Sequence, residues 1–118
     1  MSTISIEIAP FRRAAGTSQS ALDAASRRLE TDFLETLPGY LGRLVLQQGD
    51  DRFIDLAIWA SRADADAAGE KAKTSETCAA YFACMADADP DAPEAGVEHY
   101  AVIAAFGQAR TLTELVPA

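Results

Sequence analysis

Residues 40–60, YLGRLVLQQGDDRFIDLAIWA, hold two apolar runs on either side of a short polar segment. Both runs, Tyr40 to Gln47 and Arg52 to Trp59, are rich in branched and aromatic residues, which favour β-strands. Between them, Gln48-Gly49-Asp50-Asp51 is polar and contains a glycine, as hairpin turns do. The stretch therefore predicts a β-hairpin in the middle of the chain.

Upstream of the hairpin, the sequence predicts a strand and then a helix. Residues Thr3 to Phe11 alternate between apolar and other residues, which is the period of a strand. The capping pair Ser20 and Asp23 then precedes a helical stripe that Pro38-Gly39 ends. The stripe consists of Leu22, Ala25, Leu29 and Phe33.

Downstream, Ser61 and Asp64 form a second capping pair before an alanine-rich helix that runs toward Met85. Gly69 and Thr74-Ser75 weaken this helix, so a kink or break is expected there. A loop at Asp87 to Gly96 leads to a fourth strand, Val97 to Phe106. From Gly107 we expect a tail with a short terminal segment at Leu112 to Val116.

The resulting order β-α-β-β-α-β is the ferredoxin-like pattern of the α+β class. We expect a single domain over residues 1–118, with one antiparallel sheet and both helices on one face. Apolarity favours the isoleucines for the helix-covered face: Ile4, Ile6, Ile8, Ile54 and Ile58. The other face would then carry Phe53, Val45 and Trp59 and need a partner sheet, which predicts a homodimer with a barrel between the subunits.

Composition limits the classes of partner. The formal net charge is −8 and the sequence pI is about 4.4, so phosphate backbones and anionic membrane surfaces are not expected partners. No apolar run reaches the ~20 residues of a membrane span, and Met1 to Pro10 lacks a basic signal-peptide start. A cytoplasmic location is expected.

The two cysteines, Cys78 and Cys84, lie six residues apart in the expected helix and cannot pair there, so free thiols are expected.

Several segments resemble the antibiotic-biosynthesis-monooxygenase-like superfamily over roughly Ile4 to Phe106. They are Pro38-Gly39-Tyr40, the hairpin, and Ile58-Trp59-Ala60-Ser61 before the alanine-rich helix. The tracts Cys78-Ala79-Ala80-Tyr81-Phe82 and Glu98-His99-Tyr100 resemble an uncharacterised bacterial branch of it. The resemblance implies a dimeric α/β barrel and a group that includes cofactor-free oxygenases of aromatic polyketides and haem-degrading enzymes.

The sequence departs from the haem-degrading members. Those proteins place an iron-binding histidine on the second helix, whereas the only histidine here, His99, lies on an expected strand. Glu7 stands where they have asparagine, although Trp59 occupies a comparable position. We therefore expect no haem, no other cofactor and no tightly bound metal.

Six residues are candidates for a site. The catalytic candidates are Glu7, Asp55 and His99; the substrate-binding candidates are Trp59, Phe53 and Arg43. A buried carboxylate with a raised pKa can act as a base, histidine can transfer protons near neutral pH, and tryptophan can form an aromatic wall. The structural alternatives for the carboxylates are salt bridges with Arg43 or Arg52, or solvation near the barrel mouth. The alternative for His99 is a hydrogen-bonded structural histidine, and for Trp59 packing in the barrel core or dimer interface.

The acidic loop imitates another kind of site. Asp87-x-Asp89-x-Asp91 with Glu98 at the twelfth position matches EF-hand ligand spacing. Ala92 replaces the required glycine and a strand follows in place of a helix, so we expect a solvated loop.

Two functions remain open from the sequence. The first is a small-molecule-binding protein resembling cofactor-independent monooxygenases, which would deprotonate an aromatic or other planar substrate for reaction with oxygen. The second is a non-catalytic ligand-binding or structural dimeric module. For the first, Glu7, Asp55, Trp59 and His99 are expected together on the helix-free face of the sheet, with Ile6, Ile54, Leu56 and Tyr100 facing the helices.

Overall fold

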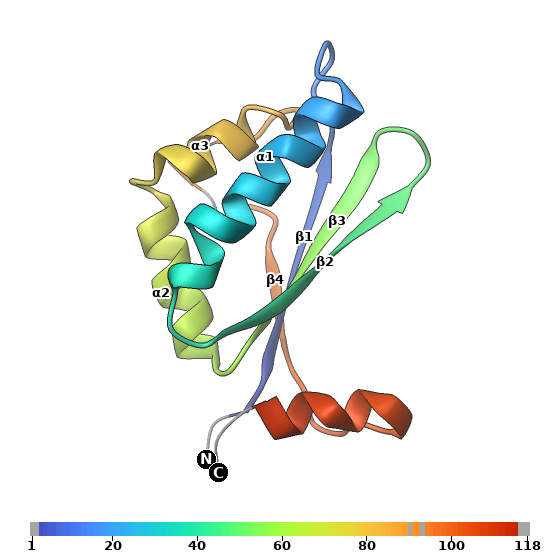
Figure 1. Ribbon diagram of the computed structural model, residues 1–118, viewed down its shortest axis with the longest axis vertical. Helices are drawn as coiled ribbons and strands as arrows, with labels where there is room; N and C mark the ends of the chain where they lie inside the picture. Colours follow the sequence, from blue (N-terminus) through green and yellow to red (C-terminus); the bar gives the residue numbers. More distant parts are fainter. Residues whose placement is uncertain (1–2, 90, 93, 116–118) are drawn as a thin grey trace.

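The computed structural model describes residues 3–89, 91, 92 and 94–115 (Figure 1). The sheet has the strand order β2-β3-β1-β4, and every neighbouring pair is antiparallel. This is the ferredoxin-like arrangement expected from the sequence. The elements are β1 (Ser5–Arg12), α1 (Gln19–Asp32), η1 (Leu34–Thr36), β2 (Tyr40–Gln48), β3 (Arg52–Trp59), α2 (Arg62–Ala72), α3 (Glu76–Phe82), β4 (Glu98–Ala101) and η2 (Gly107–Leu115).

Capping serines fix where the helices begin. Ser61 caps α2 as expected, because its Oγ accepts from the Asp64 N–H at 3.1 Å. The expected break after α2 is also confirmed, and Ser75 caps α3 by accepting from the Cys78 N–H. The expected cap of α1 is wrong: Ser18, and not Ser20, accepts from the Ala21 N–H at 3.1 Å.

The cysteines and the last strand differ from expectation. Cys78 lies in α3 and is buried, whereas Cys84 lies beyond the end of α3; both thiols are free. Strand β4 ends at Ala101 and not at Phe106, because its partner β1 begins at Ser5 and the Val102 N–H already bonds to the Ile4 carbonyl. Beyond this bond Ile103 is 95% exposed, and η2 follows. Val116, the last residue of the expected terminal segment, lies outside the described residues.

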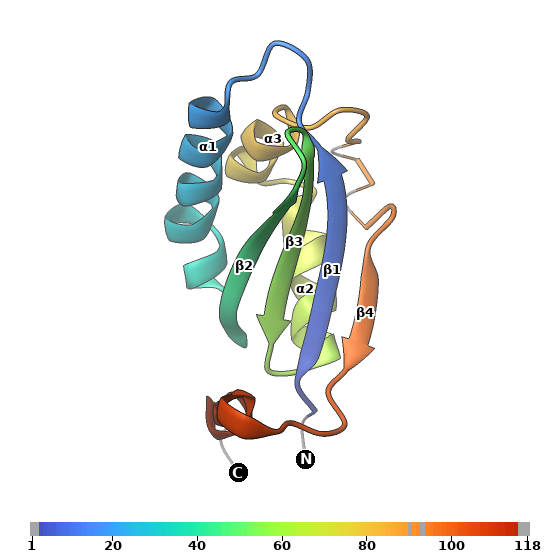
Figure 2. The ribbon, with the colours of Figure 1, turned by 90° about the vertical axis from the view of Figure 1, so that its right-hand side faces the viewer.

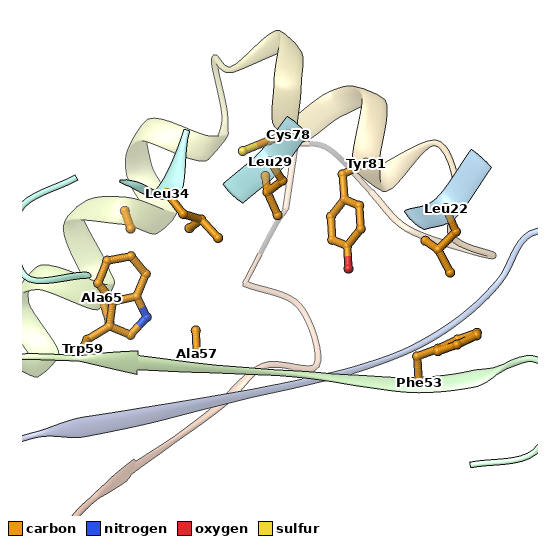
Figure 3. Packing of buried hydrophobic residues seen from close by; sticks show 10 residues of the cluster. Leu22, Leu29, Leu34, Phe53, Ala57, Trp59, Ala65, Cys78 and Tyr81 are labelled. Atoms are coloured by element: carbon orange, nitrogen blue, oxygen red, sulfur yellow. The ribbon is translucent and has the colours of Figure 1, made fainter. Parts of the chain in front are cut away.

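The helices cover only one face of the sheet, and Figure 2 shows the other face uncovered. Phe53, Ala57 and Trp59 of β3 point toward the helices, as Figure 3 shows, and Trp59 is only 2% exposed. Side chains alternate along a strand, so the intervening residues lie on the helix-free face. With most of their register partners they form an apolar set, called here the open face: Ile6, Ile8, Leu44, Leu46, Ile54, Leu56, Ile58 and Tyr100; Glu98, the partner of Ile8, lies on the same side.

The predicted assignment of the two faces was therefore wrong. The isoleucines at 6, 8, 54 and 58 lie on the open face, while Ile4 precedes β1 and is buried. The reason is that a period of two separates residues into two sets without saying which set meets the helices. Figure 3 shows the small Ala65 beside the large Trp59 ring, and Ala68 belongs to the same buried cluster. No helix among the described residues is long and apolar enough to cross a membrane.

Candidate functional site

A pocket of about 260 Å³ lies between the covered face of the sheet and the helices. Its sheet side includes Ala9 and Ala57, and its helix side includes Ala68 and Ala72. These four small side chains face one another between larger ones and so leave space unfilled. Aromatic residues also line the pocket: Phe11, Phe33, Trp59, Tyr81 and Phe82.

Strand register brings polar residues to the pocket. Arg43 of β2 pairs with Ala57 of β3, Ala57 pairs with Glu7 of β1, and Glu7 pairs with His99 of β4. This row crosses the whole sheet and its members share one face. Asp55 pairs with Ala9, two residues from Glu7, so the two carboxylates are diagonal neighbours on adjacent strands.

Glu7 is a largely buried carboxylate held by Trp59. The indole Nε1–H of Trp59 donates to Glu7 Oε1 at 3.0 Å. Burial raises the pKa of Glu7, and the nearby carboxylate of Glu94 raises it further. His99 and the hydrogen bond from Trp59 lower the pKa of Glu7, but by less than burial raises it. Glu7 is thus a stronger proton acceptor than an exposed glutamate.

His99 lies behind Glu7 and does not itself line the pocket. Its side chain is 7% exposed, and its Nε2 lies 3.3 Å from Oε2 of Glu94, which does line the pocket. His99 Nδ1 is buried with no hydrogen-bond partner among the described residues. Glu94 is 44% exposed, so it connects the buried histidine with the surface.

A second polar cluster surrounds Asp55. The Tyr81 hydroxyl donates to Asp55 Oδ2 at 2.6 Å, and Arg43 Nε lies 3.7 Å from Asp55 Oδ1. The guanidinium also donates to the carbonyl and hydroxyl of Ser26 and lies 5.7 Å from the centre of the Tyr81 ring. Burial raises the pKa of Asp55 even though Arg43 and Tyr81 favour its charged form. The pKa of Tyr81 is raised well above its usual range by burial and by Asp55, so Tyr81 remains a hydrogen-bond donor.

The structure brings most of the predicted site residues together, but on the face opposite to the predicted one. Glu7, Asp55, Trp59 and Arg43 line the pocket on the helix-covered face, and His99 lies behind it. Phe53 does not line it; its ring stacks on Phe11 at 5.3 Å, beside a second hollow near the hairpin. The open face carries Ile6, Ile54, Leu56 and Tyr100 instead, contrary to expectation.

Tyr81 and Glu94 line the pocket although the sequence did not identify them as site residues. Tyr81 was interpreted as a core contact, since a tyrosine at helical spacing on an apolar stripe is typical of a core. Glu94 lies in an irregular acidic loop, for which no periodicity predicts a direction. The salt-bridge alternative for Asp55 is present, with Arg43 as partner. The proposed catalytic and binding roles remain predictions.

The described residues do not offer the ligand arrangement that haem or a metal ion would need. The only histidine projects from β4 toward Glu94, while α2 and α3 contain none. Among the described residues, no group of three or more His, Cys, Asp or Glu side chains is placed to hold a metal ion. In the acidic loop Asp89 accepts from the Asp91 N–H, and Glu98 lies in β4.

Comparison with known proteins identifies the fold. No family model and no curated protein sequence matches the chain. Among solved structures, a variant of SnoaB, a cofactor-independent oxygenase from Streptomyces nogalater, is similar with a TM-score of 0.62 and 14% identity over 92% of this chain and 98% of that one. A candidate antibiotic biosynthesis monooxygenase from Chloroflexus aurantiacus has a TM-score of 0.57 and 18% identity over 89% and 98%.

A haem-degrading protein from Mycobacterium tuberculosis is also similar, with a TM-score of 0.54 and 17% identity over 91% of this chain and 99% of that one. Neighbours of different chemistry thus share this arrangement of strands and helices, and identities this low show the fold alone. The resemblance seen in the sequence is confirmed at that level: the chain has the fold of the antibiotic-biosynthesis-monooxygenase-like proteins.

Proposed function

We propose that the pocket binds a planar organic molecule and that the protein oxygenates it without a cofactor. The observation that carries the proposal is Glu7, a buried carboxylate that lines an aromatic pocket and is held by the Trp59 indole. A carboxylate with a raised pKa, fixed in direction and shielded from water, is suited to remove a proton.

In the proposed reaction Glu7 takes a proton from a CH₂ group that an aromatic ketone activates. The carbanion passes its electrons to molecular oxygen, a C–O bond forms, and the peroxide anion takes up a proton from solvent. Loss of water then leaves a carbonyl, so that CH₂ and O₂ become C=O and H₂O. Arg43, Asp55 and Tyr81 would orient the substrate, and His99 with Glu94 would carry the proton from Glu7 toward solvent. SnoaB, described as a cofactor-independent oxygenase, shares the fold and makes this chemistry a reasonable first test.

A non-catalytic binding module is the second candidate. It is favoured by the cluster around Asp55, where the carboxylate already accepts from Tyr81 and faces Arg43. Such mutual pairing is what a structural ion pair requires, and Glu7 is also partly satisfied by Trp59.

Oxygen consumption with an aromatic ketone that carries an activated CH₂ group tests the enzyme proposal. We expect Glu7→Gln to reduce turnover by at least about a hundredfold, since a general base contributes 10²–10⁴. Gln keeps an oxygen that can accept from Trp59, so binding of an uncharged ketone should persist. Binding without oxygen uptake by the native protein would favour the module, and native mass spectrometry would identify any ligand retained on purification.

A homodimer is the proposed assembly. Phe53 and Trp59, which the sequence predicts on a face that needs a partner, are covered by the helices, but the open face supplies a better reason for a dimer. It is built from aliphatic residues, of which Leu44 is 55% exposed and Leu46 42%. Apolar surface of this kind is typical of an interface, and a second copy would close the barrel.

The proposed location is the cytoplasm, where the free thiols of Cys78 and Cys84 would stay reduced.

A further inference from the structure

The covered face carries two pairs of the same design, each made of a carboxylate and an aromatic ring that donates to it. In the first, Tyr81 donates to Asp55 at 2.6 Å; in the second, Trp59 donates to Glu7 at 3.0 Å. The two carboxylates are diagonal neighbours on adjacent strands, and all four residues line the same pocket.

The first pair shows which chemistry this design accepts. The guanidinium of Arg43, 7% exposed, lies over the Tyr81 ring at 5.7 Å and has Nε 3.7 Å from Asp55 Oδ1. A planar organic cation is therefore held inside the protein by a carboxylate on one side and an aromatic face on the other. In the first pair, the positive charge of Arg43 therefore balances the negative charge of Asp55.

The second pair has a different electrostatic surrounding. Apart from Asp55 and Arg43, the charged side chains that line the pocket are all acidic: Glu7, Asp87, Asp89 and Glu94. No lysine and no second arginine occurs among the described lining residues. His99, behind Glu7, faces Glu94 as well. A ligand beside Glu7 and Trp59 therefore experiences a negative potential in a region of low dielectric, where charge acts strongly.

We propose that Glu7 and Trp59 recognise the cationic nitrogen of a planar heteroaromatic ligand. This inference rests on the proposed function and names its ligand class. An anionic ligand would be repelled by the acidic lining, whereas a cation gains from both the carboxylate and the indole face. A cationic nitrogen conjugated to the reacting carbon would also acidify its C–H bond, which brings proton removal within reach of a carboxylate.

Three probes of similar shape and different charge test the inference: N-methylquinolinium, quinoline at mildly alkaline pH, and naphthoate. Trp59 is the only tryptophan, so its indole N–H gives a single NMR signal at the site. Titration of that signal should give a Kd for N-methylquinolinium at least about tenfold lower than for quinoline, equivalent to about 1.4 kcal/mol, with naphthoate weakest.

Variants separate local recognition from net charge. Glu7→Gln should raise the Kd of N-methylquinolinium at least about tenfold and leave that of quinoline within about twofold. Glu35→Gln removes the same charge from an exposed position outside the pocket and should change neither. The ranking of the three probes on the native protein does not depend on any variant folding.

Each outcome of these titrations either supports or overturns the cation inference. Equal affinity for quinoline and N-methylquinolinium, or tightest binding of naphthoate, overturns the cation inference and leaves the proposed function standing. Equal losses for both ligands in Glu7→Gln also overturn it. If none of the probes moves the Trp59 signal, both the inference and the proposed binding function fail.

Discussion

The two faces of the sheet use the same strands for different purposes. The covered face mixes aromatic rings with charged groups, and each charged group there contacts another element: Glu7 meets Trp59, Asp55 meets Tyr81, and Arg43 meets Ser26 of α1. The open face is aliphatic except for Tyr100, whose hydroxyl donates to Glu98 on the same side of β4. A face with paired polar groups around a pocket suits recognition of a small molecule. A mainly aliphatic face suits contact with another apolar sheet.

Breaking the open face should have the largest effect. Leu44→Lys places a charge on that face, and in a two-fold dimer the change occurs twice. Each buried, unpaired lysine costs several kcal/mol, so we expect a folded monomer by analytical ultracentrifugation. Its neighbour on β2 is the matched control: Val45 is similarly exposed at 46% but alternates onto the opposite face, so Val45→Lys should remain dimeric. Dissociation of both variants, or of neither, would contradict the distinction between the faces.

The next effect contrasts neighbouring residues of β3 in the monomeric Leu44→Lys background. Trp59→Ala removes a fully buried ring and should lower the free energy of unfolding by about 3–5 kcal/mol. Ile58 lies on the open face and is half-buried. Ile58→Ala should therefore lower the free energy of unfolding by only about 1–2 kcal/mol. Urea denaturation followed by circular dichroism measures both. Equal losses would mean that Ile58 is covered within one chain.

Much of the fold could be predicted from the sequence because its signals are local. The hairpin around Gly49, the Ser61 cap and the break before Ser75 follow from turn chemistry, capping and helix propensity, and all three are present. The length of β4 could not be predicted in this way. Its end depends on where the pairing of β1 starts, which is a long-range property.

The site was predictable as a set of residues but not as a location. The ferredoxin-like strand order correctly placed Glu7 and His99 on neighbouring strands, and alternation correctly placed them on one face. Alternation does not say which face the helices cover; small residues of α2, Ala65 and Ala68, belong to the same buried cluster as Trp59. Hydrophobicity alone favoured the isoleucines for the helix-covered face. It could not separate the two faces, because a face buried in a dimer interface is also apolar. Glu94 escaped notice because an irregular loop positions it.

The carboxylate of Glu7 should make stability depend on pH. Its pKa is raised in the folded protein, so folding favours the protonated form. This contribution is fully present below the unfolded pKa of about 4.3 and is lost as pH rises through the folded pKa. Glu7→Gln should therefore be more stable than the native protein at neutral pH, with a difference that shrinks toward about pH 4.

Chemical denaturation across this pH range checks the sign. Glu35→Gln, an exposed change of equal charge, should track the native protein at every pH. A Glu7→Gln protein that is less stable at neutral pH would mean that the charged form of Glu7 is the one that the fold stabilises.

The smallest effect concerns the rim of the covered face, where Gly69 of α2 lies under Glu94. Alanine in place of a helical glycine ordinarily stabilises a protein by about 1 kcal/mol. Here a Cβ at Gly69 would overlap the Glu94 carboxylate, which is the flexible end of a side chain and can move away. The gain in helix propensity should then be offset in part by loss of the 3.3 Å contact between Glu94 and His99.

A double-mutant cycle isolates that contact. Glu94→Gln should lower the free energy of unfolding by about 0.5 kcal/mol in the native protein, as loss of a weak hydrogen bond does, and by nearly nothing in Gly69→Ala. The expected net gain from Gly69→Ala alone is therefore below the usual ~1 kcal/mol. If Gly69→Ala gives the full gain and Glu94→Gln has the same effect in both backgrounds, Glu94 is not held over α2. The path from His99 to the surface would then lose its outer member, while the Glu7–Trp59 pair would be unaffected.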